Sequence, residues 1–114
     1  MKTVARVLGV LALVIPAVAS AGDRPATPPA TWADVLAMPA VRAAVDSLSP
    51  ADKASVGEAS TGWVQTPLMV GGDGTRYVTA CRPHLCASDY VRIELKDGRA
   101  RVQVVRDGKT SAAR

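Results

Sequence analysis

Apolar and polar residues alternate on both sides of the dipeptide Asp97-Gly98, within residues 89–106. An Asp-Gly pair between two alternating segments is typical of the two-residue type I′ turn of a β-hairpin. Pairing the segments across this turn places six apolar residues on one face, as Leu95–Ala100, Ile93–Val102 and Val91–Val104. The other face then pairs Glu94 with Arg101 and Arg92 with Gln103. Because a slip of one residue would move every apolar side chain to the polar face, the pattern predicts this register as well as the hairpin.

Three short helices are expected before the strands. Thr31 is a favourable N-cap residue, with an acid three positions later near the positive end of the helix dipole. Pro39 is expected to open a second helix, whose apolar residues recur at helical spacing: Val41, Ala44, Val45 and Leu48. The segment Ser49-Pro50-Ala51-Asp52 combines a cap, a first-turn proline and an acid, and so predicts a third helix from Pro50 to about Val56.

About four antiparallel strands are expected after the helices, in residues 63–70, 75–81, 89–96 and 99–106. Helices followed by strands indicate the α+β class, with N-terminal short helices packed on an antiparallel sheet of about four strands. We expect one domain over residues 31–108. Residues 22–30 hold three prolines and are expected to be a flexible leader, and residues 109–114 are expected to be a frayed tail.

Residues 1–21 resemble a secretory signal peptide. Lys2 and Arg6 precede an apolar run, and Ala19-Ser20-Ala21 is a typical small-residue cleavage site before Gly22. The apolar run is too short for a membrane anchor, so we expect export and cleavage after Ala21. Cleavage would leave 93 residues and remove two of the 14 basic residues but none of the 10 acidic ones. The mature net charge is then +2.

Size and composition restrict the function classes. A chain of 114 residues can form one small domain, and a hydrophobic content of 48% argues against disorder. A charge of +2 is too small to indicate a nucleic-acid partner. The sequence contains no recognisable nucleophile–base pair, phosphate-binding loop or catalytic pair of carboxylates. We therefore expect neither an enzyme nor a cofactor.

The two cysteines and the only histidine of the chain fall within one segment, Cys81-Arg82-Pro83-His84-Leu85-Cys86. A redox dithiol usually has two residues between its cysteines, whereas this segment has four. A metal site could use both thiolates and the imidazole, but a fourth ligand has no obvious source. The third interpretation is a loop closed by a disulfide, which an oxidising compartment favours.

In a disulfide-closed loop, the bridge and Pro83 restrict the chain, and His84 is presented at the tip with little conformational entropy left to lose on binding. The simpler version of this interpretation is a stapled turn whose histidine only contacts solvent. We favour a recognition loop, because a tight turn alone does not require this combination of residues.

The segment from Tyr77 to Cys86 resembles the inhibitor of vertebrate lysozyme (Ivy) family of bacterial periplasmic proteins. The hallmark of that family is a disulfide-closed Cys-Lys-Pro-His-Asp-Cys loop, and the resemblance extends over roughly residues 60–105. Arg82 stands in place of the family lysine and keeps its positive charge. Leu85 stands in place of the family aspartate.

The resemblance implies a periplasmic inhibitor whose loop enters the active-site cleft of a C-type lysozyme. Cys81 and Cys86 would form the bridge, and Arg82, Pro83, His84 and Leu85 would be the target-binding loop. Because the mature charge gives no long-range attraction to a basic lysozyme, a lytic transglycosylase is a second expected target. A homodimer is a further expected partner, and the alternative function is a non-inhibitory periplasmic interaction module.

Six other side chains have simpler interpretations. Trp32 and Trp63 are expected to pack in or beside the core, and Tyr77 and Tyr90 to pack on the sheet. Asp89 is expected to be a solvated loop residue, although a role in orienting the loop is the alternative. Glu58 has no recognisable partner in the sequence.

Overall fold

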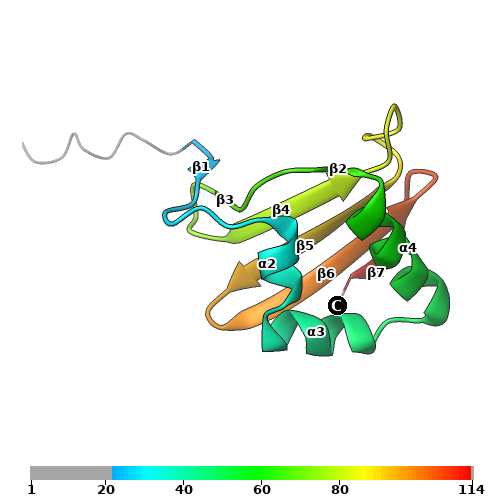
Figure 1. Ribbon diagram of the computed structural model, residues 1–114, viewed down its shortest axis with the longest axis horizontal. Coiled ribbons are helices and arrows are strands. Elements are labelled where there is room, and N and C mark those ends of the chain that lie inside the picture. Colours follow the sequence, from blue (N-terminus) through cyan, green and yellow to red (C-terminus); the bar gives the residue numbers. More distant parts are fainter. Residues whose placement is uncertain (1–21, 114) are drawn as a thin grey trace, which may run out of the picture.

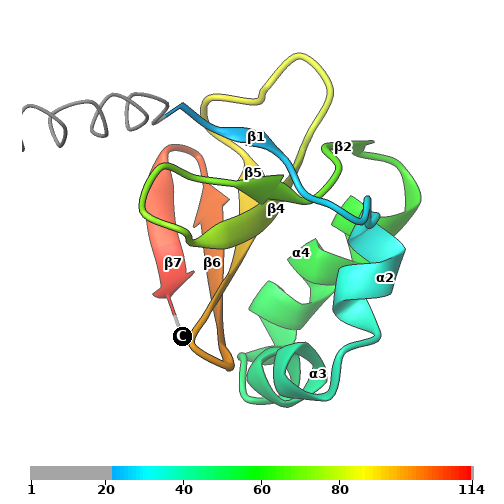
Figure 2. The same cartoon turned by 90° about the vertical axis from the view of Figure 1, so that its left-hand side faces the viewer.

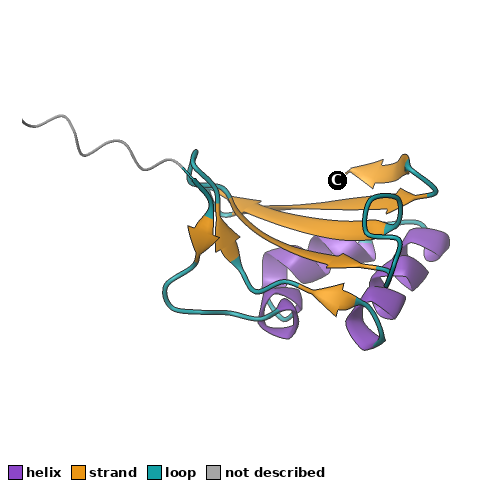
Figure 3. Ribbon diagram, turned by 90° about the horizontal axis from the view of Figure 1, so that it is seen from above, coloured by secondary structure: helices purple, strands orange, loops and turns teal. Residues whose placement is uncertain are grey.

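The computed structural model describes residues 22–113 as an antiparallel sheet with three helices on one face (Figure 1, Figure 3). The helices are α2 (Trp32–Leu36), α3 (Pro39–Asp46) and α4 (Pro50–Thr61). The seven strands are β1 (Arg24–Pro25), β2 (Val64–Gln65), β3 (Met69–Val70), β4 (Arg76–Cys81), β5 (Tyr90–Lys96), β6 (Arg99–Arg106) and β7 (Lys109–Ala113). Their order is β1-β3-β4-β5-β6-β7, and β2 also pairs with β4. The expected signal peptide lies outside the described residues.

The α+β class is confirmed, but the expected count of about four strands is wrong. The segment 63–70 forms two short strands, β2 and β3, on either side of Pro67, which has no N–H to donate to a strand partner. The segment expected to be a flexible leader contributes β1, which pairs with β3. The segment expected to be a frayed tail contributes β7, which pairs with β6.

The β6–β7 hairpin turns at Asp107-Gly108, which repeats the dipeptide of the predicted hairpin. Asp107-Gly108 has the same backbone conformation as Asp97-Gly98, with φ values of 51° and 76° in both turns. Positive φ at both central residues is the requirement of a type I′ turn, so the chain reverses twice in the same way. The Asp52 carboxylate also accepts a hydrogen bond of 2.7 Å from the Ser111 hydroxyl, which ties β7 to helix α4.

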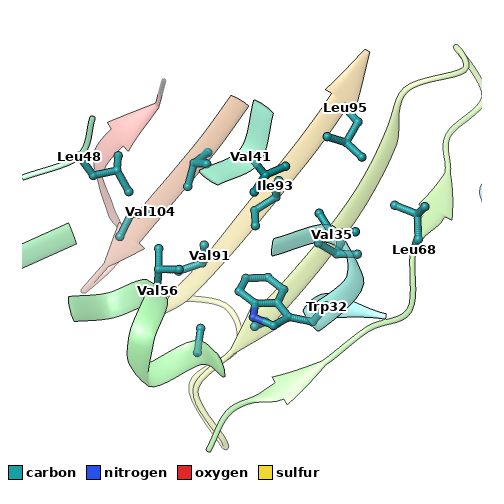
Figure 4. Packing of buried hydrophobic residues seen from close by; sticks show 14 of the residues in the cluster. Trp32, Val35, Val41, Leu48, Val56, Leu68, Val91, Ile93, Leu95 and Val104 are labelled. Carbon is teal, nitrogen blue, oxygen red and sulfur yellow. The ribbon is translucent and has the colours of Figure 1, made fainter. Parts of the chain in front are cut away.

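The central hairpin has the predicted register. β5 and β6 pair Leu95 with Ala100, Ile93 with Val102 and Val91 with Val104, and the polar pairs on the other face are also as predicted. The apolar face lies under the helices, where Val91, Ile93, Val102 and Val104 are fully buried. Figure 4 shows these strands packing against side chains of all three helices.

The predicted helix starts are confirmed. Thr31 and Asp34 form a reciprocal capping box at α2, and the backbone N–H of Thr31 lowers the pKa of the Asp34 carboxyl by hydrogen bonding to it. The Ser49 hydroxyl caps α4 by accepting from the Asp52 N–H. Helix α4 continues past the expected end near Val56 to Thr61. Gly57 lies inside the helix, and the residue that ends it is Gly62.

Trp32 is buried in the core at 2% exposure, as expected, and its indole N–H donates to the Ser60 hydroxyl at 2.9 Å. Trp63 is half-buried and packs against the edge of the same core, which is also as expected. Within residues 22–113, no helix is long and apolar enough to cross a membrane.

The central position of Ile93 gives a test of this packing. Ile93→Ala removes a fully buried side chain from the middle of the sheet, and should lower the free energy of unfolding by about 2–5 kcal/mol. Urea denaturation followed by circular dichroism measures the loss. The control, Arg99→Ala on the exposed end of β6, should change stability by less than about 0.5 kcal/mol. Equal midpoints for the two variants would contradict the assigned core.

Candidate functional site

The segment between β4 and β5 forms a loop that protrudes beyond the end of the sheet (Figure 1, Figure 2). The predicted disulfide between Cys81 and Cys86 is present, and it brings their Cα atoms to 4.7 Å. The bridge holds both sulfurs, so neither is a free thiolate for a metal or redox centre. By the chain-entropy relation, closing so short a ring stabilises the fold by about 2 kcal/mol.

Inside the ring the backbone makes a tight turn. The Leu85 N–H donates to the Arg82 carbonyl at 2.9 Å, and His84 adopts the left-handed conformation with φ of 68°. Left-handed backbone is uncommon for residues other than glycine and is usually held by its surroundings. The bridge, Pro83 and the turn hydrogen bond therefore restrict the loop together.

Arg82 is directed to the base of the loop rather than to its tip. Its guanidinium lies 3.3 Å from a Glu58 carboxylate oxygen and 3.6 Å from one of Asp89. The same group lies over the ring of Trp63, at 5.4 Å from the centroid, which is a cation–π distance. Arg82, expected among the target-binding residues, thus contacts helix α4 and the residues just before β2 and β5. Glu58 has the partner that was not recognisable in the sequence.

Asp89 is buried at 6% exposure, so its expectation as a solvated loop residue is wrong. Its carboxylate accepts a 2.9 Å hydrogen bond from the Asp107 N–H and contacts Arg82 on the other side. The next residue along the turn, Gly108, donates its N–H to the Ser88 carbonyl at 2.9 Å. The β6–β7 turn therefore braces the base of the loop, and Asp89 orients it, as in the alternative interpretation.

The tip consists of Pro83, His84 and Leu85, all exposed. No side-chain hydrogen bond or ion pair involves His84 within the described part of the chain, so both imidazole nitrogens are open to a partner. The tip residues themselves carry no fixed charge, and at the base the single Arg82 guanidinium faces the two carboxylates of Glu58 and Asp89. Chemically, the loop presents one imidazole on a rigid support, with one guanidinium and two carboxylates at its base.

The two tyrosines lie on the helix-free face of the sheet and are half-buried, which agrees with sheet packing. The Tyr77 ring is covered by the Arg92 guanidinium at 3.9 Å, and its hydroxyl donates to the Asp23 carboxylate. This hydrogen bond is the main reason that the pKa of Tyr77 is raised. It also ties the N-terminal segment to the sheet.

A hollow lies at the opposite end of the sheet from the loop. It has a volume of about 810 Å³ and is lined mainly by charged side chains, among them Asp73, Glu94, Lys96 and Arg101. Ion pairs join Lys96 with Asp73 and Arg101 with Glu94. In residues 22–113, no group of three or more histidine, cysteine or acidic side chains is placed to hold a metal ion.

Comparisons with known proteins return no match. No family model matches the chain, and neither a curated protein nor a solved structure matches it.

Substitutions of the two carboxylates that contact Arg82 test how the loop is held in place. Asp89→Ala should lower the free energy of unfolding by about 1–3 kcal/mol, because it removes a buried acceptor and leaves the Asp107 N–H without its partner. Glu58→Ala removes an exposed ion pair and should cost less than about 1 kcal/mol. Urea denaturation measures both, and hydrogen exchange at the Arg82 and Leu85 amides reports the loop directly. An equal cost for the two variants would contradict the bracing role of Asp89.

Proposed function

We propose that this chain is an exported, periplasmic inhibitor of a peptidoglycan-cleaving enzyme, either a C-type lysozyme or a lytic transglycosylase. The inhibitor inserts its 81–86 loop into the active-site cleft of the enzyme, with His84 leading. The observation that carries the proposal is the placement of His84 at the exposed tip of a ring that is closed by a disulfide and braced at its base.

The rigidity of the loop supports this function. A segment that is already ordered loses little conformational entropy when it binds, so more of its contact energy contributes to affinity. The bridge restricts the ring, while Arg82 and Asp89 fix the base relative to helix α4 and the β6–β7 turn. A protruding and pre-organised segment of this kind suits insertion into a cleft.

The chemistry of His84 supports a carboxylate-bearing target. Glycoside hydrolysis generally uses a pair of acidic side chains, one of which must donate a proton to the leaving group. An imidazole between these groups hydrogen-bonds to them, and the bond is charge-assisted when the ring is protonated. The inserted loop thereby excludes the polysaccharide and occupies the acid that the reaction needs.

An inhibition assay tests the proposal. The mature protein, starting at Gly22, should slow the clearing of a bacterial cell-wall suspension by a C-type lysozyme or by a lytic transglycosylase. His84→Ala should weaken inhibition by about tenfold or more, as expected for a central contact residue. Arg99→Ala, at the far end of the sheet, is the matched control and should inhibit like the unaltered protein.

The bridge is tested by the double variant Cys81→Ser/Cys86→Ser, because a reductant would also act on disulfides of the target enzyme. Loss of the ring should weaken inhibition while the fold is retained, which circular dichroism checks. Failure of the unaltered protein to slow either class of enzyme would refute inhibition. Capture of a cell-envelope partner without glycan-cleaving activity would then favour the non-inhibitory interaction module.

A further inference from the structure

Two large hydrophobic side chains are exposed in the described part of the chain, one within the loop and one beside it. Val64 is 55% exposed and Leu85 is 45% exposed. Val64, in β2, is directly opposite Cys81 at the end of β4, and Cys81 is bonded to Cys86, the neighbour of Leu85. Val64 and Cys81, 17 positions apart in the sequence, are thus paired at the end of the sheet that carries the loop.

The side chains next to Val64 extend this apolar area. Val64, Cys81 and Tyr90 are directly opposed across β2, β4 and β5, so they share one face of the sheet. That face is the helix-free one, because Val78 and Ala80, which alternate with Cys81 along β4, are buried on the other. We call Val64, the Cys81–Cys86 bridge and Tyr90 the loop-base row.

The distribution of charge separates the loop-base row from the rest of the face. The next row toward the middle of the sheet is polar, with Thr79, Arg92 and Gln103 opposed across β4, β5 and β6. The ion pairs of Glu94 and Lys96 lie further along, toward the opposite end. The exposed tip residues Pro83, His84 and Leu85 carry no fixed charge, and the Arg82 guanidinium is paired at the loop base with the Glu58 and Asp89 carboxylates.

We propose that the loop-base row and Leu85 form a second contact surface, which packs against the apolar and aromatic wall of the enzyme cleft that His84 enters. This inference rests on the proposed function and names the wall that the inhibitor contacts. Ligand clefts are lined mainly by hydrophobic and aromatic side chains, with a few polar groups at the reacting centre. His84 meets the polar groups, and Val64 and Leu85 meet the surface on which sugar rings would pack.

The size of the row argues for this occupant over a second copy of the chain. A stable interface buries in total about 1,200–2,000 Å², whereas a buried aromatic side chain supplies about 150–250 Å². Tyr90 with two aliphatic neighbours is therefore too small for the core of a homodimer. It is large enough to extend an interface whose centre is the inserted loop.

Substitutions at Val64 test the inference, with inhibition and dissociation rate measured against the enzyme that the unaltered protein inhibits. Val64→Asp should weaken inhibition by about tenfold or more, because the interface would desolvate a charge. Val64→Thr keeps the β-branched shape of an exposed strand residue and should weaken inhibition by about threefold. In both variants the dissociation rate should rise more than the association rate falls.

Ala113→Asp is the control. It places the same charge on an exposed residue of β7, at the opposite edge of the sheet, and should leave inhibition within twofold of the unaltered protein. If the unaltered protein inhibits and both Val64 variants inhibit equally well, the second contact surface is refuted while the proposed function stands.

The remaining outcomes also decide between interpretations. If the unaltered protein inhibits neither enzyme class, the proposed function fails and this inference falls with it. If gel filtration shows a dimer that Val64→Asp converts to a monomer, the loop-base row is covered by a second copy of the chain and the inference is overturned.

Discussion

The hydrogen-bonded register of β4, β5 and β6 is the constraint on which the other features depend. It pairs residues continuously from Arg76 to Cys81 and from Tyr90 to Lys96. One face of these pairs is apolar and seals against the helices, while the other carries ion pairs and half-buried tyrosines. The same register places the 81–89 loop and the β6–β7 turn at one end of the sheet. The bracing of the loop is therefore a consequence of strand pairing.

Local signals in the sequence account for the elements that were predicted well. The central hairpin has a strong turn dipeptide and an alternation that only one register satisfies, and its pairing is as expected. The helix starts carry their own capping residues at Thr31 and Ser49. These features depend on residues within a few positions of one another, so a single sequence is enough to find them.

The missed strands depend on distant contacts. β1 has two residues, too few to show an alternation, and it exists through its pairing with β3. β7 contains small and polar residues without an apolar stripe, and it is held by β6 and by the hydrogen bond from Ser111 to Asp52, 59 positions away. The turn Asp107-Gly108 was the available signal, because it repeats the dipeptide of the predicted hairpin.

In the candidate site, too, the features set by local sequence were predicted and those set by distant contacts were not. The ends of the ring and the position of His84 follow from one short segment of sequence, but the groups that brace the ring come from three other places in the chain. Glu58 lies 24 positions before Arg82, and the amide that binds Asp89 lies 18 positions after it. An acid in a loop is usually solvated, and Asp89 is buried only because a later turn closes over it.

The two tryptophans, which absorb in the near ultraviolet, lie in two different parts of the fold. The Trp32 indole is enclosed by the core, whereas the Trp63 indole is half-buried and contacts the guanidinium at the loop base. Fluorescence from the first indole reports whether the helices remain on the sheet. Fluorescence from the second reports whether the loop keeps its position, so the molecule carries an intrinsic optical probe of its own candidate site.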